Sequence, residues 1–545
     1  MTIRAFRVTM HNMDTAIAMH EKETQIESLT ARVAELTEKL AKMETLIKYY
    51  ESQFLKMRRR QFGASSEKFV TDTPEYRQTN LFSNVAPEEM KKLPGPETEE
   101  VTYKRRKRRG KREEDLSGLP VERINYELPE EERACPECGG TMRDIGTDVR
   151  RELKLVPAQV IVVEHAAHAY ACANCQKNGE STPVAKSELP AALIPGSLAS
   201  PSLVAYIMAQ KYLNGMPLHR IEKGFTYDGA AISRQTMAGW VIKCADVYMA
   251  GIYDLMARRL LEETALHADE TTLQVLKEPG RPARSKSYEW VYRTSGGAEH
   301  PIVVFDYKET RKKEHPREFL KGFKGLLHTD GYEAYHSLPS GITVVGCWAH
   351  LRRKWENLLK TLPEARRKGS EAERGLRHIN LLFEHERGFE KLKPEERHRK
   401  RLEKSKPVAE EFYEWIGTLG ALPKSPLGEP VRYALSQKQY LMNVFADGRA
   451  ELSNNRCENS IRPFVQGRKA WLFSSTPEGA RASSVIYSII ETAKENGLHP
   501  YHYMKFLLET LPNTKTSGLE ALLPWSESLP DYCHMPFKEK RPDEN

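Results

Sequence analysis

The order of predicted strands and helices in the middle of the chain constrains its fold more than any other sequence feature. Stretches rich in β-branched and aromatic residues predict strands, and turns and one short helical segment separate them. The predicted elements are strands at 265–276, 287–294 and 301–307, a helix at 317–323, and strands at 325–330 and 342–348. Three adjacent strands followed by alternating helix and strand predict an α/β domain built on one sheet.

This order is that of an RNase H-like α/β sheet, and it carries two aspartates at informative positions. Asp269 lies on the first predicted strand, and Asp330 ends the fourth. Neighbouring strands can bring two carboxylates to one pair of Mg²⁺ ions. Phosphoryl transfer on DNA needs such a cluster, because two hard cations about 4 Å apart activate the attacking oxygen and stabilise the leaving one. A single aspartate on a strand is more often a surface or turn residue, so spacing alone does not decide the site.

A third acid must come from further along the chain, and Glu458 is the candidate. It follows asparagines that open a predicted helix, which Pro463 limits. Glu451 and Glu478 are alternatives for the same role. The 128 positions between the second aspartate and this glutamate are too many for one sheet connection. Residues 351–422, dense in Arg, Glu, Leu and Phe, therefore predict an all-α insertion within the catalytic core.

Near the N-terminus, apolar residues repeat every seven positions. The first position of each heptad is occupied by Met19, Ile26, Val33, Leu40, Ile47 and Phe54, and the interleaved position by Leu29, Leu36, Met43, Tyr50 and Met57. Five heptads hold one register, which exceeds the three or four that indicate a coiled coil. Residues 15–57 are therefore predicted to form a parallel, leucine-zipper-like dimer. The alternative is a single helix that lies on the rest of the protein.

The excess positive charge of the chain is concentrated in one run. Lys and Arg number 83 against 75 Asp and Glu, which leaves a net charge of +8, and residues 104–112 contain eight basic residues and no acid. The basic residues of this run are Lys104, Arg105, Arg106, Lys107, Arg108, Arg109, Lys111 and Arg112. Such a run repels itself, so residues 58–125 predict a basic, partly disordered linker that binds DNA phosphates as an arm. A solubilising linker is the alternative.

Two Cys-x-x-Cys pairs predict a metal site. Cys135 and Cys138 form the first pair, and Cys172 and Cys175 form the second. The β-branched stretch between them suits strands of a ribbon, so residues 126–185 predict a zinc-finger or zinc-ribbon domain with one structural Zn²⁺ held by four thiolates. An iron–sulfur centre and paired disulfides are the alternatives. Eight cysteines in 545 residues fit a reducing compartment.

Residues 195–262 are predicted to be helical and helix-turn-helix-like. The pattern consists of a helix at 218–225, a glycine in the turn, and a second helix capped by Ser233. Arg234 and Gln235 lie in the first turn of the second helix, where recognition helices contact base edges. Plain packing of two helices is the commoner explanation of such a pattern.

Composition excludes several classes of protein. The chain is 39% hydrophobic and 29% charged, which is too apolar for a wholly disordered protein. No run approaches the roughly 18 apolar residues of a membrane span, and the N-terminus lacks the apolar core of a secretory signal. We therefore expect a cytoplasmic protein without a membrane partner.

Several segments together resemble the large transposases of insertion-sequence family sixty-six. Alongside the zipper and the basic run, they are RRRQFGASSEKF, CPECGG with CANC, HADET, HTDGYEAY, GCWAHLRRKW, NNRCENSIRPFVQGRKAWLFSS and VIYSIIETAKENGLHPYHY, in family order. The resemblance implies a DDE transposase in which Asp269, Asp330 and Glu458 are the catalytic, metal-binding triad. It implies two Mg²⁺ ions per active site, with Mn²⁺ as an alternative, besides the structural zinc.

The resemblance also implies the partners and the reaction. The enzyme would bind the terminal inverted repeats of its own insertion sequence, cut them, and transfer the strands to target DNA. We expect a homodimer or higher oligomer at the bacterial nucleoid, together with small companion proteins of the same element. Two other functions stay open: a regulator or scaffold that binds DNA without catalysis, and a structure-selective nuclease of the same fold.

Further residues of the core are candidates for DNA contact. They are Arg352, Arg353, Lys354, Arg462, Arg468 and Lys469, each of which is alternatively a solvated surface charge. His350 is a candidate for orienting the site, with a structural role as the alternative. The predicted core consists of residues 263–350 and 423–485, and a C-terminal helical region follows at 486–530.

Overall fold

The computed structural model describes residues 159–171 and 184–535, together with the single positions 32, 37, 123 and 153. All described residues from 159 onward belong to one compact unit. The heptads other than those single positions, the basic run and both Cys-x-x-Cys pairs lie outside the described residues. The predictions made on those segments therefore remain predictions.

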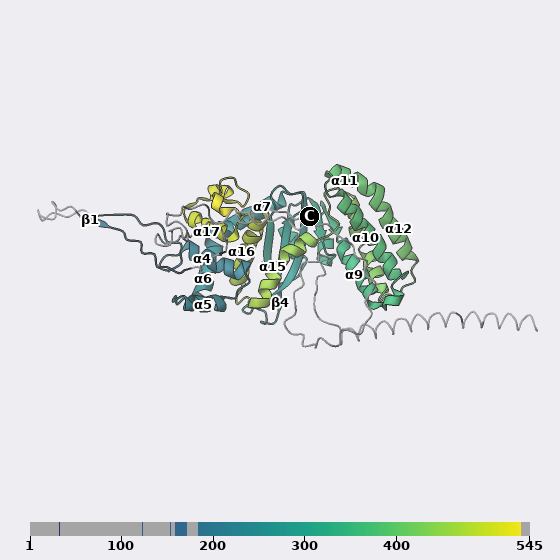
Figure 1. Cartoon of the computed structure of the whole chain (residues 1–545), viewed down its shortest axis with the longest axis horizontal. Helices are drawn as coiled ribbons and strands as arrows, with labels where there is room; N and C mark the ends of the chain where they lie inside the picture. Colours follow the sequence, from purple (N-terminus) through teal and green to yellow (C-terminus); the bar gives the residue numbers. More distant parts are fainter. Residues whose placement is uncertain are drawn as a thin grey trace, which may run out of the picture. The chain divides into compact units, whose positions relative to one another are not determined.

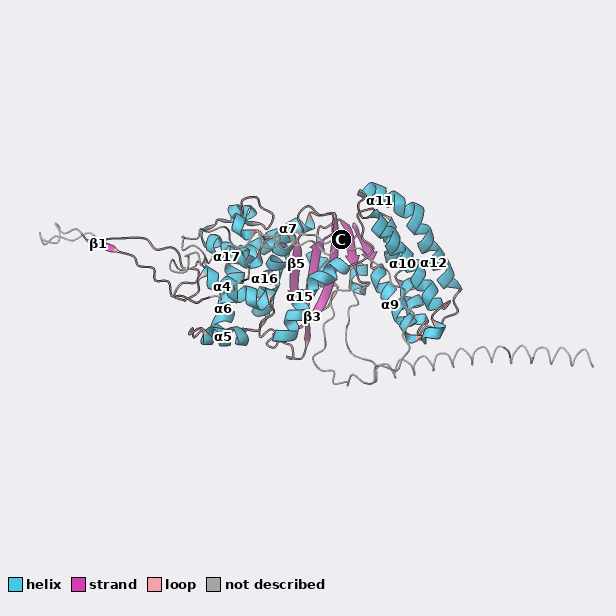
Figure 2. Cartoon of the chain, in the orientation of Figure 1, coloured by secondary structure: helices cyan, strands magenta, loops and turns pink. Residues whose placement is uncertain are grey.

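Five strands form one mixed sheet in the order β5-β4-β3-β6-β7 (Figures 1 and 2). The strands are β3 (Ala265–Gln274), β4 (Lys286–Thr294), β5 (Val303–Lys308), β6 (Gly325–Thr329) and β7 (Ile342–Gly346). β4 is antiparallel to both β3 and β5, whereas β6 is parallel to β3 and β7 is parallel to β6. All five predicted strands are confirmed. A separate antiparallel pair is formed by β1 (Ala169–Ala171) and β2 (Val184–Lys186).

The register of the sheet places the two predicted aspartates on neighbouring strands. β3 and β6 pair in parallel, with His267 opposite His328. Asp269 and Asp330 each follow two residues after the histidine of their own strand. Because the two strands run parallel in this register, Asp269, midway along β3, lies level with Asp330, which directly follows β6.

The short helix between β5 and β6 begins earlier than the sequence predicts. α8 spans Glu314–Phe319, whereas the expected range was 317–323. Pro316 is tolerated because the first turn of a helix does not need its amide hydrogen bonds. Gly322 adopts a positive φ of 92°, which ends the helical conformation before residue 323.

α16 (Pro477–Glu495) packs against β5 and completes the hydrogen bonding of that edge strand. The Ser488 hydroxyl accepts from the amide of Phe305 at 2.8 Å. The Thr492 hydroxyl accepts from the amide of Val303 and donates to its carbonyl, both at 3.0 Å. These bonds occupy backbone groups that an edge strand would otherwise offer to another chain.

The helix pair predicted within residues 195–262 is present. α5 spans Leu218–Tyr227 and α6 spans Arg234–Cys244. The Ser233 hydroxyl accepts from the amide of Thr236 at 3.1 Å, which confirms the predicted N-cap. The chain continues through a π-helical turn into α7 (Ala250–Leu261). Together with α4 (Pro201–Met208), α16 and α17 (Pro500–Thr510), these helices share one apolar core with β3, β4 and β5.

A second apolar core belongs to the helical region between β7 and α15. Its helices are α9 (Trp348–Thr361), α10 (Glu371–Phe389), α11 (Pro394–Lys400), α12 (Lys406–Thr418), α13 (Gly428–Ser436) and α14 (Lys438–Met442). Trp355 and Phe412 are fully buried in this core, and Gly375 leaves room for the Trp355 ring, which a side chain there would strike. The same core includes Val431 and Leu441, so helical packing continues beyond residue 422, where the sequence interpretation ended the insertion.

α15 (Asn455–Trp471) packs along β3 and carries the third predicted acid. The expectation that Pro463 limits this helix is wrong, because α15 continues through it for eight further residues. Ile461 and Phe464 flank the proline and are buried in the sheet core. Burial of this apolar face offsets the single backbone hydrogen bond that the proline removes.

Within 159–171 and 184–535, no helix is both long and apolar enough to cross a lipid bilayer.

Candidate active site

Three carboxylates meet where β6 ends beside the middle of β3. Oxygen atoms of Asp269, Glu270 and Asp330 all lie within 4.8 Å of one another. The backbone amide of Glu270 donates to Asp269 Oδ1 at 2.8 Å, and the amide of Tyr332 donates to Asp330 Oδ1 at 2.9 Å. These two bonds hold the aspartates in place. The structure thus brings together Asp269 and Asp330 and adds Glu270, which the sequence interpretation did not include.

Glu458 reaches the same region from the first turn of α15. A ligand atom of its carboxylate lies within 4.8 Å of those of Cys347 and His350, at the junction of β7 and α9. Glu458 Oε1 is 3.7 Å from His350 Nε2, and Oε2 is 3.5 Å from the guanidinium of Arg353. The negative charge of Glu458 also contributes to raising the pKa of Asp269. Asp269 and Asp330 thus belong to one cluster of carboxylates, and Glu458 belongs to a second cluster whose charge reaches Asp269.

The acids perturb one another because they are largely buried and close to one another. Burial, followed by the charges of Glu270 and Asp330, raises the pKa of Asp269 well above its ordinary value. Burial and Asp330 also raise the pKa of Glu270, and Arg311 opposes that rise. Burial lowers the pKa of His350 and so favours its neutral form, although the charges of Glu458 and Asp330 act in the opposite direction.

The donor set suits a hard divalent cation. Carboxylate oxygens are the ligands that Mg²⁺ and Mn²⁺ prefer in proteins. Among the described residues, Glu458 Oε1 is buried and has no hydrogen-bond partner. A buried carboxylate oxygen without a donor carries a desolvation cost, which a bound cation removes. The side chains that would hold the cation are those of Asp269, Asp330 and Glu458.

Glu270 is already held by two other side chains. Its carboxylate accepts hydrogen bonds from the guanidinium of Arg311 and, at 2.7 Å, from the hydroxyl of Tyr335. The Arg311 guanidinium also lies over the Tyr332 ring, 3.6 Å from its centroid. Because both carboxylate oxygens have donors, Glu270 contributes negative charge to the cluster without an oxygen left unpaired.

Asn454, the N-cap residue of α15, connects three elements beneath the acids. It is fully buried, and its side chain does not cap its own helix. Its amide nitrogen Nδ2 donates to the carbonyl of Ala268 at 2.9 Å, and its Oδ1 accepts from His267 Nδ1 at 2.8 Å. Its backbone amide donates to the Cys347 sulfur at 3.2 Å. Burial raises the pKa of Cys347 to about 11, so the sulfur remains a thiol.

The two alternatives for the third acid are held by other partners, and Glu451 also lies 3.4 Å from His267 Nε2. Glu451 accepts from the Arg456 guanidinium at 2.9 Å and from the Gly296 amide at 2.8 Å. Glu478 is exposed near the start of α16, where it pairs with Arg481 at 3.3 Å. Neither glutamate belongs to the two groups of clustered metal-ligand side chains found in the described part of the chain. The geometry therefore favours Glu458.

The predicted DNA-contact residues are not gathered in one place. Arg353 contacts Glu458, whereas Arg352 bonds Asn380 at 2.7 Å on the helical insertion. The Arg468 guanidinium bonds the hydroxyl of Thr271 on β3 at 3.1 Å. Among the described residues, the predicted DNA-contact residues with exposed side chains are Arg234, Gln235, Arg353, Arg462 and Lys469.

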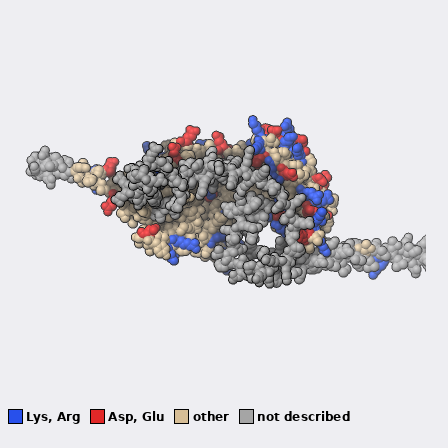
Figure 3. Space-filling model, in the orientation of Figure 1, with Lys and Arg blue, Asp and Glu red and all other residues tan. Residues whose placement is uncertain are grey.

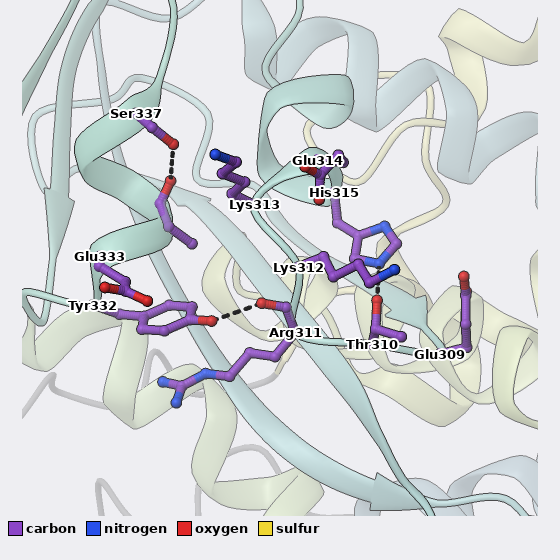
Figure 4. A pocket seen from close by; sticks show the side chains of 11 residues that line it. Glu309, Thr310, Arg311, Lys312, Lys313, Glu314, His315, Tyr332, Glu333 and Ser337 are labelled. Atoms are coloured by element: carbon purple, nitrogen blue, oxygen red, sulfur yellow. Dashed lines mark hydrogen bonds between the residues drawn. The ribbon is translucent and has the colours of Figure 1, made fainter.

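A pocket of about 880 Å³ adjoins the acids on the side of Arg311. The loop after β5 forms one wall with Arg311, Lys312 and Lys313, and Tyr332 and Ser337 belong to the opposite wall (Figure 4). The Tyr332 hydroxyl donates to the Arg311 carbonyl at 2.7 Å and links the two walls.

On the helical insertion, basic and acidic side chains are intermixed (Figure 3), so the face in view there has no single sign of charge.

Comparison with known proteins connects this geometry to one family. The sequence model of the Transposase IS66 family matches residues 196–482, just over half of the chain. Three further models match: the zinc-finger binding domain of transposase IS66 at 132–176, the IS66 C-terminal element at 488–525, and Transposase C of IS166 homeodomain at 49–124. The zinc-finger match spans both Cys-x-x-Cys pairs.

Relatives in Sinorhizobium fredii match most of the chain. The uncharacterized protein y4qI is 31% identical over 424 residues, which cover 74% of this chain and 76% of the relative. The uncharacterized protein y4jD is 28% identical over 435 residues, which cover 76% of this chain and 82% of that relative. On the strength of these matches, the chain belongs to the IS66 family of transposases.

Proposed function

We propose that this transposase cuts the ends of its own insertion sequence and joins them to target DNA, with Asp269, Asp330 and Glu458 as its catalytic triad. The placement of these acids supports the proposal: Asp269 on β3 and Asp330 after β6 share one carboxylate cluster, and the charge of Glu458 in the first turn of α15 reaches Asp269. The acids are far apart in sequence, and two alternative glutamates lie elsewhere. A set of carboxylates without a matching cation is costly unless it binds a metal.

We assign the catalytic core to the RNase H-like fold. The order β5-β4-β3-β6-β7 supports this assignment, because three antiparallel strands are followed by two parallel strands on the other side of β3. In such a sheet the first strand is central, so an acid on it lies beside an acid at the end of its parallel neighbour. The helical insertion then separates the second acid from the third without disturbing the sheet.

Each part of the site has a task in strand cleavage and transfer. A pair of divalent cations, Mg²⁺ or Mn²⁺, supplies activation of the attacking oxygen and stabilisation of the leaving oxygen when bound. Asp269 and Asp330 hold their carboxylates at fixed positions through backbone amides. Arg353 has a side chain that is 55% exposed beside Glu458, where it can bind a DNA phosphate.

The other predicted parts of the protein would bring DNA and a second protomer to this site. A zinc-bearing domain at 126–185, the basic run at 104–112, and Arg234 with Gln235 on α6 would bind the terminal repeats. The coiled coil at 15–57 would pair two protomers, and small companion proteins of the element would join them.

A strand-transfer assay on the ends of the element tests the proposal. Asp269→Asn, Asp330→Asn and Glu458→Gln should each reduce cleavage at least about 100-fold while end binding persists, because each removes a metal-ligating charge and little packing. Glu478→Gln is the matched control, since that glutamate is exposed and pairs with Arg481. A triad variant that retains substantial strand transfer would exclude that residue from the triad, and loss of activity in the control would contradict the assignment.

A further inference from the structure

We propose that His350 is a ligand of one divalent cation at this centre, through Nε2, and that this nitrogen makes the centre favour Mn²⁺ over Mg²⁺. The inference rests on the proposed function, because it adds a ligand to the same centre. It concerns a residue outside the three-acid set, and it specifies the class of metal.

The position of His350 is that of a ligand facing Glu458. His350 is the third residue of α9, and Glu458 lies in the first turn of α15. His350 Nε2 and Glu458 Oε1 are 3.7 Å apart, which is too long for a hydrogen bond. Two ligand atoms that bind one ion at about 2.1 Å are separated by roughly 3 to 4.2 Å. The observed separation therefore fits a shared ion better than a direct bond.

The Glu458 oxygen that faces His350 lacks the hydrogen bond that a partly buried carboxylate oxygen normally accepts. Among the residues that the structure describes, Glu458 Oε1 and His350 Nδ1 are buried atoms without a partner. More than nine in ten buried backbone polar groups, and most buried side-chain ones, are hydrogen-bonded in folded proteins. The negative charge of Asp330 acts on His350 as well, so the imidazole lies among acids from two other elements. A cation between Glu458 Oε1 and His350 Nε2 would satisfy that carboxylate oxygen, whereas Nδ1 lies on the other side of the ring and would not contact the cation.

The neighbouring Cys347 and Arg353 do not serve as ligands. The Cys347 sulfur is fully buried and accepts a hydrogen bond from the Asn454 amide, and a thiol is a poor ligand for a hard cation. Arg353 contacts the other oxygen of Glu458 and is itself a cation. The resulting donor set consists of carboxylate oxygens and one imidazole nitrogen.

An imidazole nitrogen changes which cation binds best. Mg²⁺ binds oxygen ligands and keeps several waters. First-row transition metals accept nitrogen together with oxygen, and Mn²⁺ is the one that also suits a carboxylate-rich site. One nitrogen ligand should therefore raise the affinity for Mn²⁺ relative to Mg²⁺.

Electron paramagnetic resonance of Mn²⁺ tests the inference on the full-length, zinc-loaded protein. In wild-type protein, pulsed measurements should detect coupling between bound Mn²⁺ and an imidazole nitrogen, and labelling of histidine with ¹⁵N should change that coupling. His350→Gln should abolish the coupling and raise the Mn²⁺ Kd at least about tenfold. Competition with Mg²⁺ should show that the preference for Mn²⁺ falls in the same variant.

His378→Gln is the matched control. His378 Nε2 lies 3.5 Å from Glu411 on the helical insertion, so it has the same kind of carboxylate neighbour away from the acids. This variant should bind Mn²⁺ as the wild type does. Bound Mn²⁺ without nitrogen coupling in the wild type would overturn the proposal, even if His350→Gln failed to fold. Unchanged Mn²⁺ affinity in Asp269→Asn and Asp330→Asn would instead overturn the proposed function.

Discussion

At the scale of single residues, Asp269 combines burial with two acidic neighbours. The pKa of its carboxyl group is raised well above the ordinary value of 3.8, first by burial and then by Glu270 and Asp330. In the metal-free protein, the ionised carboxylate therefore costs stability. A divalent cation binds that same ionised carboxylate. Function at this position should thus oppose stability, as it often does at active sites.

This conflict predicts an unusual effect of Asp269→Asn. In metal-free protein at neutral pH, the variant should be more stable than the wild type by about 1 kcal/mol or more, because it removes a buried charge. For a domain of this size the Tm should rise by about 2–4 °C. Thermal unfolding in a chelating buffer measures the change. A lower Tm would show that Asp269 is a structural residue.

The same argument predicts how the effect depends on pH. Because the folded-state pKa is raised, the folded protein binds more protons than the unfolded one between the two pKa values, and its stability falls as the pH rises through the raised value. The advantage of Asp269→Asn should therefore vanish below the ordinary pKa of 3.8, grow as the pH rises towards the raised pKa, and stay constant above it. Saturating Mn²⁺ should reverse the order of stability. Glu478→Gln, at an exposed position, should show none of these changes.

At the scale of elements, the position of α15 depends on Asn454. This buried residue joins the start of α15 to Ala268 and His267 on β3 and to Cys347 before α9. Ala268 precedes Asp269, and Glu458 lies one turn after Asn454. The hydrogen bonds thus set the distance between the strand that carries one acid and the helix that carries another.

Asn454→Ala should consequently impair metal binding more than folding. Loss of the buried bonds should cost about 1–3 kcal/mol of stability, and misplacement of Glu458 should raise the Mn²⁺ Kd and lower cleavage about 10- to 100-fold. High Mn²⁺ should restore part of the activity. Metal titration and single-turnover cleavage measure these effects.

Asn443→Ala provides the matched control at the same scale. The Asn443 side-chain amide donates to the Val344 carbonyl of β7 at 2.8 Å, and this hydrogen bond involves none of the acids. Its loss should lower the Tm without changing the Mn²⁺ Kd. If both variants reduced metal affinity equally, the role of Asn454 would be general stability and not placement of α15.

At the scale of the whole molecule, the zinc-finger match predicts the metal content. Purified protein should carry about one zinc per chain, and Cys135→Ser or Cys172→Ser should lower that content and unfold the domain locally. Metal binding in such a domain supplies roughly 10 kcal/mol or more of folding free energy. Elemental analysis of protein prepared without chelator or oxidant checks this prediction. Absence of zinc from such a preparation would refute the assignment of the four cysteines.

The heptads predict how two protomers act together. Replacing Val33 and Leu40 with Asp would bury charge in the seam and should leave a monomeric, soluble core that binds one end weakly. Tethering two cores makes the second end-binding event intramolecular and can raise avidity roughly 100-fold or more. Light scattering before and after the change measures the oligomer. An unchanged oligomer would mean that the heptads form a helix within one chain.

The sequence by itself determined the elements of the core and the residues from which the site is built. Stretches rich in β-branched and aromatic residues predict the strands because such side chains pack well on a sheet, and Ser233 marks a helix start through its own side chain. Asp269 and Asp330 could be named as candidates because Asp269 lies on the first predicted strand and Asp330 ends the fourth. The family resemblance then favoured Glu458 as the third acid among the 75 Asp and Glu residues.

Only the tertiary structure decided which side chains meet. Alternation directs Glu270 away from Asp269 on a regular strand, yet their carboxylates lie close together in the folded protein. The bond between His267 and Asn454 joins positions 187 residues apart, and local pattern carries no information about such a pair. Pro463 was expected to end a helix, but burial of Ile461 and Phe464 outweighs the lost hydrogen bond. A local sequence pattern predicts strands and helices because each of these forms among residues that are close in sequence. The site depends instead on packing between strands and helices that are distant in sequence.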